Sequence, residues 1–481
     1  MREGVTLGWE QVQAAFRQIW GYEQFRVPQG EVIQCLLDRR DALIVMPTGG
    51  GKSICFQLPA LLQSGLTLVV SPLVALMENQ VQELRQRGLP AALLHSELAT
   101  GDRRRTLAAI QQQQVRLLYL SPETLLSPPV WAVLSQPQVQ INGLILDEAH
   151  CLVQWGDTFR PAYRRLGAVR SALLATKPAG TQIPIAAFTA TANPDAQAII
   201  RSVLQLIDPM IFLINPYRAN LTLKTQVTWT PRGRYQQLRQ FIHAHPQQTG
   251  LVYVRTRRDA EALADRLTQH GLTTAAYHAG LAPQHRRQLE QAWLRGELPF
   301  VLCTSAFGMG INKPDVRWVA HFHPPLLLSE YVQEVGRAGR DGQPATALAL
   351  ISEPTGWLDS EDKQRQQFFL DRLRSQHQKA TQLMGQLPPQ GRIQTVTQQF
   401  PDAAIALAIL HSTGQLTWSD PFHYRLHPGP RQPAPGMGTA HTEIIRYFRT
   451  RDCRWQFLLQ AFGFTEMATG FRCGHCDNCR R

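Results

Sequence analysis

Short apolar runs alternate with longer amphipathic stretches between residues 31 and 210 of the chain. Short runs rich in Val, Ile and Leu predict buried parallel strands. The amphipathic stretches between them predict helices that cover the faces of one sheet. We therefore expect a doubly wound α/β domain with strands at 42–46, 66–71, 115–120, 143–147 and 185–190.

The same pattern begins again after a break near residues 215–216, and the segment 220–231 is predicted to be a linker. A second parallel-sheet domain is expected, with strands at 251–255, 274–279, 300–305, 316–322 and 346–351.

Beyond residue 352 the pattern changes, and residues 359–384 predict one long polar helix. Two short helices at 392–400 and 402–412 precede two alternating runs, which predict a hairpin closed at Asp420 and Pro421. This is the order of a winged-helix module, and the alternative interpretation is a small structural spacer. The predicted domains are a first lobe at 1–215 and a second lobe at 216–352. A helical linker with a winged-helix-like unit follows at 353–440, and a cysteine-rich region at 441–481.

The composition of the chain indicates the kind of partner it binds and the cellular compartment in which it acts. The formal net charge is +13, and a polyanion is the simplest partner for such a basic chain. No apolar run is long enough to span a membrane, and the N-terminus lacks the apolar core of a signal peptide. We expect a cytoplasmic protein, associated with the nucleoid if the source is bacterial.

The sequence MPTGGGKS at 46–53 follows a predicted strand and opens a predicted helix. Glycines let backbone N–H groups close around phosphate oxygens beside a helix N-terminus. Lys52 is expected to reach the β- and γ-phosphates and Ser53 to hold Mg²⁺. Met46 stands where the usual pattern begins with glycine. The expected nucleotide-binding residues of this loop are Thr48, Gly49, Gly50, Gly51, Lys52 and Ser53.

The DEAH box at 147–150 ends a predicted strand about 95 residues beyond the phosphate loop. We expect Asp147 to hold Mg²⁺ through water and Glu148 to orient and deprotonate the attacking water. Taken alone, these two side chains could be a surface acidic pair. Their place after a phosphate loop, at a strand end, favours catalysis.

With these motifs in order, the chain resembles the RecQ branch of superfamily 2 DNA helicases over almost its whole length. The likeness implies that YEQFRVPQ at 22–29 reads adenine, with Tyr22 stacking and Arg26 and Gln29 contacting the base. It implies that SPLVALMENQ at 71–80 tracks DNA and that TAT at 189–191 links hydrolysis to lobe movement.

The likeness extends through the second lobe to QEVGRAGRDG at 333–342. By this resemblance Arg340 is the arginine finger that reaches the γ-phosphate from the opposite lobe, and Arg337 assists. Two arginines three positions apart on a helical turn can face the same side.

The segment HCLVQWGDTFRPAY at 150–163 follows the DEAH box and shows no helical or strand period. It resembles the aromatic-rich loop with which RecQ enzymes couple single-strand binding to hydrolysis. Aromatic rings and a guanidinium offer stacking surfaces for unpaired bases. We expect DNA contacts from Trp155, Phe159 and Arg160, with Tyr163 nearby. RNA helicases of the DEAD-box type lack this loop.

Cysteines cluster at the end of the chain with the spacing C-x₁₉-C-x₂-C-x₂-C. Four thiolates suit a tetrahedral structural Zn²⁺ site, and the tight triple also occurs around iron–sulfur clusters. The family likeness favours zinc. Cys453 is expected within a helical run at 442–463, and His475 is expected to be a bystander. The proposed ligands are Cys453, Cys473, Cys476 and Cys479.

Larger RecQ proteins carry a winged-helix domain after the zinc site, and this chain ends shortly after Cys479. Our hypothesis is that residues 388–427 replace that domain and bind duplex DNA. The hairpin offers Trp418, Phe422, His423, Tyr424 and Arg425 for such contacts.

The resemblance implies an ATP-dependent DNA helicase that uses ATP, Mg²⁺ and Zn²⁺ and moves 3′ to 5′. Forked or branched DNA would be its substrate in recombination, repair or replication restart, with single-strand-binding or repair proteins as partners. One alternative is a DNA-binding scaffold whose ATPase acts as a switch without processive unwinding. An RNA helicase is a second alternative, against which the aromatic-rich loop argues.

Overall fold

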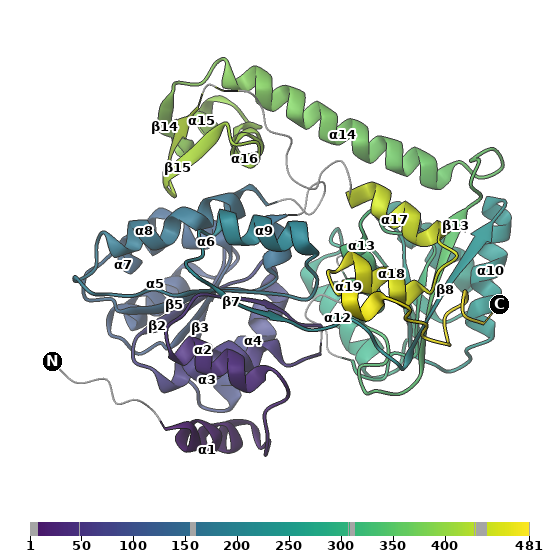
Figure 1. The fold of residues 1–481 in the computed structure, drawn as a ribbon, viewed down its shortest axis with the longest axis horizontal. Helices are drawn as coiled ribbons and strands as arrows, with labels where there is room; N and C mark the ends of the chain where they lie inside the picture. The colour runs from purple at the N-terminus through teal and green to yellow at the C-terminus, as the bar shows by residue number, and fades with distance from the viewer. Residues whose placement is uncertain are drawn as a thin grey trace. The chain divides into compact units, whose positions relative to one another are not determined.

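The computed structural model describes residues 8–47, 49–153, 160–305, 307, 313–427, 429 and 440–480 (Figure 1). The chain forms two compact units. The described residues of the first unit fall within 8–46, 50–214 and 374–429, and those of the second fall within 47–49, 215–373 and 440–480. The predicted span 353–440 is therefore divided, because its start packs with the second lobe and its later part packs with the first.

The first unit is built on a seven-stranded parallel sheet with the order β3-β4-β2-β5-β6-β1-β7. All five predicted strands are confirmed. Two strands, β3 and β7, escaped prediction, and β7 is a largely exposed edge strand. The strands are β1 Ala42–Val45, β2 Leu66–Val70, β3 Ala91–Leu94, β4 Leu117–Leu120, β5 Ile141–Leu146, β6 Ile185–Thr189 and β7 Met210–Leu213.

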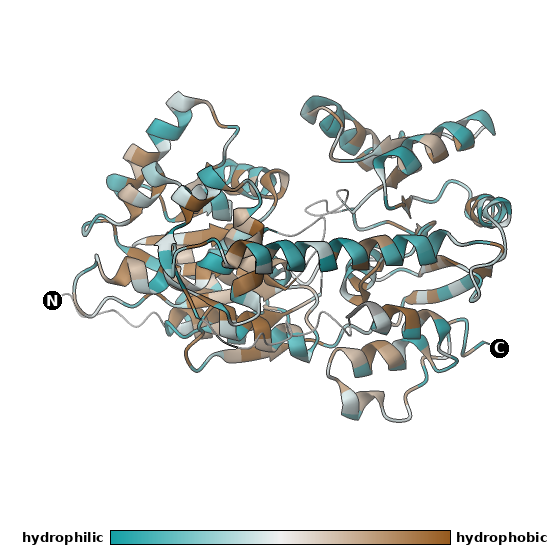
Figure 2. Ribbon diagram, turned by 90° about the horizontal axis from the view of Figure 1, so that it is seen from above, coloured by the Kyte–Doolittle hydropathy of each residue, from teal (hydrophilic) through white to brown (hydrophobic). Residues whose placement is uncertain are grey.

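Both faces of this sheet are covered, because successive side chains of a strand point to opposite sides. Along β1, Leu43 and Val45 enter one apolar cluster while Ala42 and Ile44 enter another. Figure 2 shows the hydrophobic colour gathered inside the lobes. The covering elements are α1 Trp9–Trp20, α2 Gln29–Leu37, α3 Lys52–Leu62, α4 Val74–Gln86, α5 Thr100–Gln111, α6 Pro122–Leu125, α7 Pro128–Leu134, α8 Val169–Leu174, α9 Pro194–Val203 and the 3₁₀ helices η1 Ala149–Leu152 and η2 Pro161–Ala168.

The second unit has a six-stranded parallel sheet with the order β10-β11-β9-β12-β13-β8. The five strands predicted after residue 250 are confirmed. The expectation of a linker at 220–231 is wrong for most of that segment, because β8 pairs along its whole length with β13. The strands are β8 Leu221–Thr228, β9 Gly250–Tyr253, β10 Thr274–Tyr277, β11 Phe300–Cys303, β12 Trp318–His321 and β13 Ala345–Ser352, and the helices are α10 Pro231–His243, α11 Arg257–Gln269, α12 Pro283–Leu294 and α13 Leu328–Val335.

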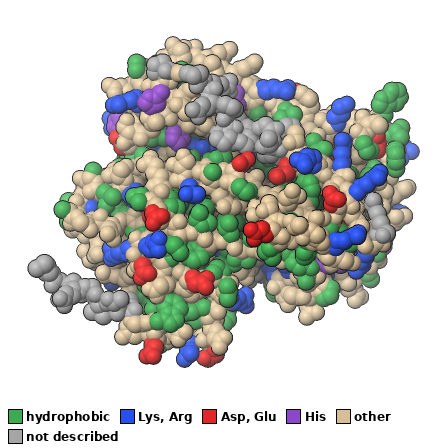
Figure 3. Space-filling view, in the orientation of Figure 1, with side chains coloured by type: hydrophobic (Ala, Val, Ile, Leu, Met, Phe, Trp, Pro, Cys, Tyr) green, Lys and Arg blue, Asp and Glu red, His purple; other side chains and the backbone are tan. Residues whose placement is uncertain are grey.

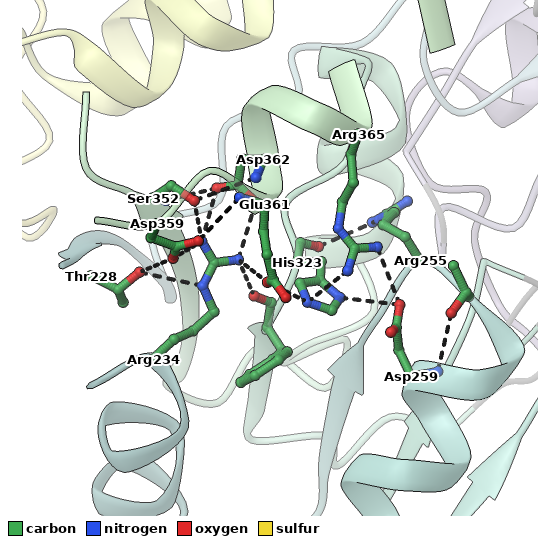
Figure 4. A network of polar contacts seen from close by, with 12 residues as sticks. Thr228, Arg234, Arg255, Asp259, His323, Ser352, Asp359, Glu361, Asp362 and Arg365 are labelled. Carbon is green, nitrogen blue, oxygen red and sulfur yellow. Dashed lines mark hydrogen bonds and ion pairs between the residues drawn. The ribbon is translucent and has the colours of Figure 1, made fainter. Parts of the chain in front are cut away.

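The predicted long helix is confirmed as α14, Glu361–Met384, and a buried polar network fixes its start to the second sheet (Figure 4). Arg234 lies at its centre and is fully buried, as is its partner Asp359, at 3.0 Å. The guanidinium also donates to Asp362 at the head of α14 and to the Phe322 carbonyl. Because every one of these groups has a partner, the network can hold a charge inside the lobe.

The predicted helix–helix–hairpin order after α14 is confirmed, with one additional strand. The elements are β14 Gln390–Arg392, α15 Ile393–Gln399, α16 Ala403–Ser412, β15 Leu416–Asp420 and β16 His423–Leu426. The strands form an antiparallel sheet with the order β14-β16-β15. We call residues 388–427 the winged unit.

The cysteine-rich region packs on the second sheet through α17 Ala440–Arg449, α18 Arg454–Ala461 and α19 Thr465–Ala468. Trp455 donates its indole N–H to the Leu221 carbonyl at 3.1 Å. The helical run expected at 442–463 is broken after Arg449, and Cys453 is the N-cap of α18. The break places Cys453 between two helices, where its thiol lies with those of the other three cysteines.

No helix in the described part of the chain combines the length and the hydropathy that crossing a bilayer requires.

We predict that Arg234→Met lowers the free energy of unfolding of the second lobe by about 3–5 kcal/mol, because it leaves Asp359 buried without its cation. The matched control is Arg295→Met. Arg295 pairs with Glu297 on the surface, where such pairs contribute about 0–1 kcal/mol. Scanning calorimetry of both variants checks this, and equal shifts in the two midpoints would contradict it.

Candidate active site and metal centre

Three sequence motifs meet at the carboxyl edge of the first sheet. The order β5-β6-β1 makes these strands neighbours, and all are parallel. The phosphate loop follows β1, the DEAH box follows β5, and the TAT segment follows β6. Parallel strands end at one edge of a sheet, which is where open α/β sheets bind ligands.

The phosphate loop leads into α3, which begins at Lys52. Gly49 and Gly51 adopt left-handed φ values of 85° and 77°. At Gly51 the left-handed φ disfavours any residue with a Cβ atom, and such an atom would also meet the Gln29 amide nitrogen. Thr48 lies outside the described residues.

The Lys52 ammonium is buried and has no hydrogen-bond partner among the described residues. A buried cation without a partner is costly, and an anion is the group that satisfies it. The next residue, Ser53, accepts a hydrogen bond at 3.2 Å from the side-chain amide of Gln80. Sequence reasoning placed Gln80 in a DNA-tracking motif and missed this contact with the phosphate loop.

The DEAH carboxylates are both buried, with Asp147 5% and Glu148 8% exposed. Burial, with the neighbouring Glu148 charge, raises the pKa of Asp147 to about 6, and the Lys52 charge opposes this rise. Glu148 has φ 52° and ψ 46°, a left-handed conformation that costs a non-glycine residue energy and is frequent at active sites. The strained turn and two buried carboxylates beside a buried cation suit metal and phosphate chemistry.

The DEAH box is tied to the TAT segment by a histidine. Nδ1 of His150 lies 3.2 Å from a Glu148 carboxylate oxygen and 3.2 Å from the Thr189 hydroxyl. The Thr189 hydroxyl in turn bonds the backbone of Thr191. A change in the charge around Glu148 can therefore reach the end of β6 through direct contacts.

The adenine-reading motif lies against the phosphate loop. Gln29 is 3% exposed, and its amide donates to the carbonyls of Gly50 and Gly51 at 3.2 and 3.4 Å. Its side-chain oxygen accepts from the Arg26 backbone N–H at 2.9 Å. Tyr22 is 53% exposed, and its ring lies 5.8 Å from the ring of Phe16. The contact of Gln29 with the loop is new, and its contact with a base stays a prediction.

Arg337 and Arg340 follow α13 in the second unit. Helix α13 ends at Val335, and residues 336–340 continue from it as successive turns rather than as a regular helix. Arg337 is 6% exposed, and its charge opposes the rise that burial gives to the pKa of Tyr253. Arg340 is half-buried. The role of Arg340 at the γ-phosphate stays a prediction.

Trp155 and Phe159 of the aromatic-rich loop lie outside the described residues. Arg160 is described, and its guanidinium lies 3.6 Å from the carboxylate of Glu123 in α6. Tyr163 does not offer a stacking surface, since it is fully buried in the core of the first lobe. Sequence reasoning missed Glu123, although it follows a helix-capping Ser121 that marks a helix start.

The expected metal ligands come together in the second unit. The sulfur atoms of Cys453, Cys473, Cys476 and Cys479 all lie within 4.8 Å of one another, and no other such group of His, Cys, Asp or Glu occurs among the described residues. Backbone N–H groups of Cys473 and Cys476 donate to the sulfurs of Cys453 and Cys473 at 3.3 and 3.2 Å. Such donors stabilise thiolates.

His475 lies outside this cluster, with Nε2 3.4 Å from the Tyr217 hydroxyl. Asp477 pairs with Arg454 at 2.8 Å and accepts from the Thr225 backbone N–H on β8. The cysteine loop is thereby attached to the edge of the second sheet.

Two parallel-sheet lobes, a phosphate loop and a DEAH box define the class of nucleotide-driven helicase motors. The chain matches the DEAD/DEAH box helicase family at residues 26–199, the helicase conserved C-terminal domain at 233–342 and the RecQ zinc-binding region at 438–480. It is 56% identical over 472 residues to the ATP-dependent DNA helicase RecQ of Synechocystis sp., covering 98% of each chain. The chain belongs to the RecQ family.

A second relative, the ATP-dependent DNA helicase RecQ of Haemophilus influenzae, is 38% identical over 72% of this chain and 54% of its own length. Among solved structures, S. cerevisiae Dbp5 bound to RNA and ADP BeF3 has a TM-score of 0.57 at 15% identity, covering 74% of this chain and 90% of its own. The Mycobacterium smegmatis helicase Lhr bound to ssDNA and AMP-PNP also reaches 0.57, at 18% identity, covering 92% and 62%. At such identities these structures support the fold alone.

We predict that Cys476→Ser lowers the zinc content of the purified protein, because a hydroxyl replaces one of four thiolates in the cluster. Cys303→Ala is the control, since Cys303 is buried in the same lobe outside the cluster. Elemental analysis measures both variants. Iron together with visible absorption in the unaltered protein would instead indicate an iron–sulfur cluster.

Proposed function

We propose that this chain is an ATP-dependent DNA helicase that moves 3′ to 5′ along one strand and unwinds forked or branched DNA. The family membership supports an ATP-driven DNA motor. Direction and junction preference are proposed from the RecQ likeness.

The single observation that carries the proposal is the Lys52 ammonium, buried without a hydrogen-bond partner among the described residues, beside two buried carboxylates. The charge of Lys52 lowers the pKa of Asp147 against the effect of burial, so the two groups interact electrostatically at the same edge of the sheet. An ATP phosphate with its Mg²⁺ has the charges that this pair requires, since the phosphate suits the cation and the metal suits the carboxylate.

In the proposed reaction Lys52 binds the β- and γ-phosphates, and the loop from Thr48 to Ser53 surrounds them with N–H groups. Ser53 and Asp147 would hold Mg²⁺, which neutralises charge on the phosphates. Glu148 accepts a proton from the attacking water. His150 fixes the orientation of Glu148 through the contact at 3.2 Å.

The second lobe and the N-terminal motif complete the proposed nucleotide contacts. Arg340 stabilises negative charge on the γ-phosphate, and Arg337 supports it. Tyr22 stacks on adenine, and Arg26 and Gln29 contact its polar edge. Gln29 already bonds two carbonyls of the phosphate loop, so adenine binding at this residue would be sensed directly by that loop.

Single-stranded DNA is proposed to bind the aromatic-rich loop through Trp155, Phe159 and Arg160. Arg160 pairs at 3.6 Å with a half-exposed Glu123, a weak contact that a phosphate could replace. The zinc ligands are proposed to be Cys453, Cys473, Cys476 and Cys479, with a structural role, because four thiolates leave no position open for catalysis.

ATP hydrolysis should be stimulated by single-stranded DNA and not by single-stranded RNA. Lys52→Ala should reduce the stimulated rate by about 100-fold or more, because it removes the cation that binds the transferred phosphate. The measurement is phosphate release without nucleic acid, with DNA and with RNA.

Each alternative has its own outcome in this assay. Equal stimulation by RNA would contradict the role given to the aromatic-rich loop and favour an RNA helicase. Absence of stimulation by either nucleic acid would contradict a motor coupled to DNA.

On tailed duplexes, we expect strand displacement to require a 3′ single-stranded tail and to disappear in Glu148→Gln, which keeps the size of the side chain but removes the base. A fluorescent strand-displacement assay with 3′-tailed, 5′-tailed and forked substrates measures this. Displacement of 5′-tailed substrates would overturn the direction. Stimulated hydrolysis without displacement on any substrate would favour the scaffold alternative.

A further inference from the structure

The winged unit has the order in which DNA-binding modules present their second helix to the major groove and a hairpin to the backbone. Here the helix α14 precedes β14, α15, α16 and the β15–β16 hairpin. The sequence hypothesis of duplex binding depends on α16 and on the hairpin tip being accessible.

The helix α16 is not accessible in this way. Its sequence, AAIALAILHS, contains no Lys or Arg, and it packs against η2 of the first lobe. Burial and the neighbouring Arg164 charge lower the pKa of its one titratable group, His411, to about 4, so it carries no charge at neutral pH. Direct readout of bases needs polar side chains, and α16 buries Ala403, Ala406, Leu407, Ala408, Ile409 and Leu410.

The hairpin tip also packs on the first lobe. The ring of Phe422 meets the ring of Trp131 in α7 edge to face, with 5.1 Å between centroids, and both rings pack against the lobe core. The Arg165 guanidinium donates to the Pro421 carbonyl at 3.2 Å. Trp418 and Tyr424, which the sequence predicted to contact DNA, are 9% and 1% exposed.

The surface that receives the winged unit is the end of the aromatic-rich loop. The segment η2 begins at Pro161, directly after Arg160, and contains Arg164 and Arg165. At its other end the loop begins in η1 of the DEAH box, where Cys151 N–H donates to the Glu148 carbonyl. Contacts that fix η2 therefore also fix the position of Arg160, the residue directly before it.

We propose that the winged unit is an internal brace on the first lobe, and that Phe422 is a positioning residue for DNA-stimulated ATP hydrolysis. The brace fixes η2 and, through it, Arg160 and the end of the aromatic-rich loop. The role of the winged unit is therefore to support the first lobe, and not to bind duplex DNA as the order of its elements would suggest. This inference rests on the proposed function.

The test compares Phe422→Ala with Arg425→Ala. Phe422 contacts Trp131, whereas Arg425 lies on the same hairpin with an exposed side chain. For Phe422→Ala we expect the single-stranded DNA concentration that half-saturates hydrolysis to rise roughly tenfold, with the KM for ATP unchanged. Arg425→Ala should leave both values, and the affinity for blunt duplex DNA, unchanged.

Two further variants guard against a simple folding defect. Phe422→Leu keeps an apolar side chain at the contact and should restore most of the DNA response. Arg165→Met removes the hydrogen bond to Pro421 together with a positive charge that acts on Glu123, and it should weaken the response in the same direction as Phe422→Ala. Circular dichroism and the thermal midpoint establish that each variant is folded.

The outcomes separate this inference from the proposed function. If the unaltered protein is not stimulated by DNA, the proposed function fails and the brace fails with it. If it is stimulated but Phe422→Ala and Arg165→Met respond normally, the brace is wrong. A loss of duplex affinity in Arg425→Ala would likewise overturn it and support duplex binding by the hairpin.

Discussion

The carboxyl edge of the first parallel sheet is the constraint on which the site depends. Hydrogen bonding in register makes β5, β6 and β1 end side by side. Segments that lie far apart in the chain then meet at this edge of the sheet. Lys52, Asp147 and Thr189 are brought to one place in this way. The burial that results raises the pKa of Asp147 and leaves the Lys52 ammonium in need of an anion.

Segments that are not part of the two sheets are held in place by buried arginines. In the first lobe Asp41 accepts from Arg170 and from two backbone N–H groups. In the second lobe Arg234 attaches the start of α14, and Arg454 attaches the cysteine loop through Asp477. Lys and Arg side chains are otherwise spread over the face drawn in Figure 3. Satisfied buried networks select one arrangement, because an unpaired charge inside a lobe is so costly.

The winged unit shows why the order of elements does not decide what a module does. Its order is that of DNA-binding domains, and its sheet order agrees. The apolar side chains of α16 instead pack on η2, and Phe422 packs against Trp131, while Arg425 on the hairpin stays exposed. Function depends on which face of a module is polar and exposed, and a fold alone leaves that open.

The sequence by itself determined ten strands of the two parallel sheets, the two strands of the hairpin, the phosphate loop, the DEAH carboxylates and the cysteine cluster, because apolar runs and motif chemistry are local properties. Strand β8 was missed because many of its side chains are exposed, so that it lacks a continuous apolar run. Its pairing with β13 is what makes it a strand. The burial of Tyr163, the contact of Gln29 with the phosphate loop and the position of Cys453 between two helices also depend on distant partners. Tertiary structure decided these features, since each is set by what a side chain meets across the fold.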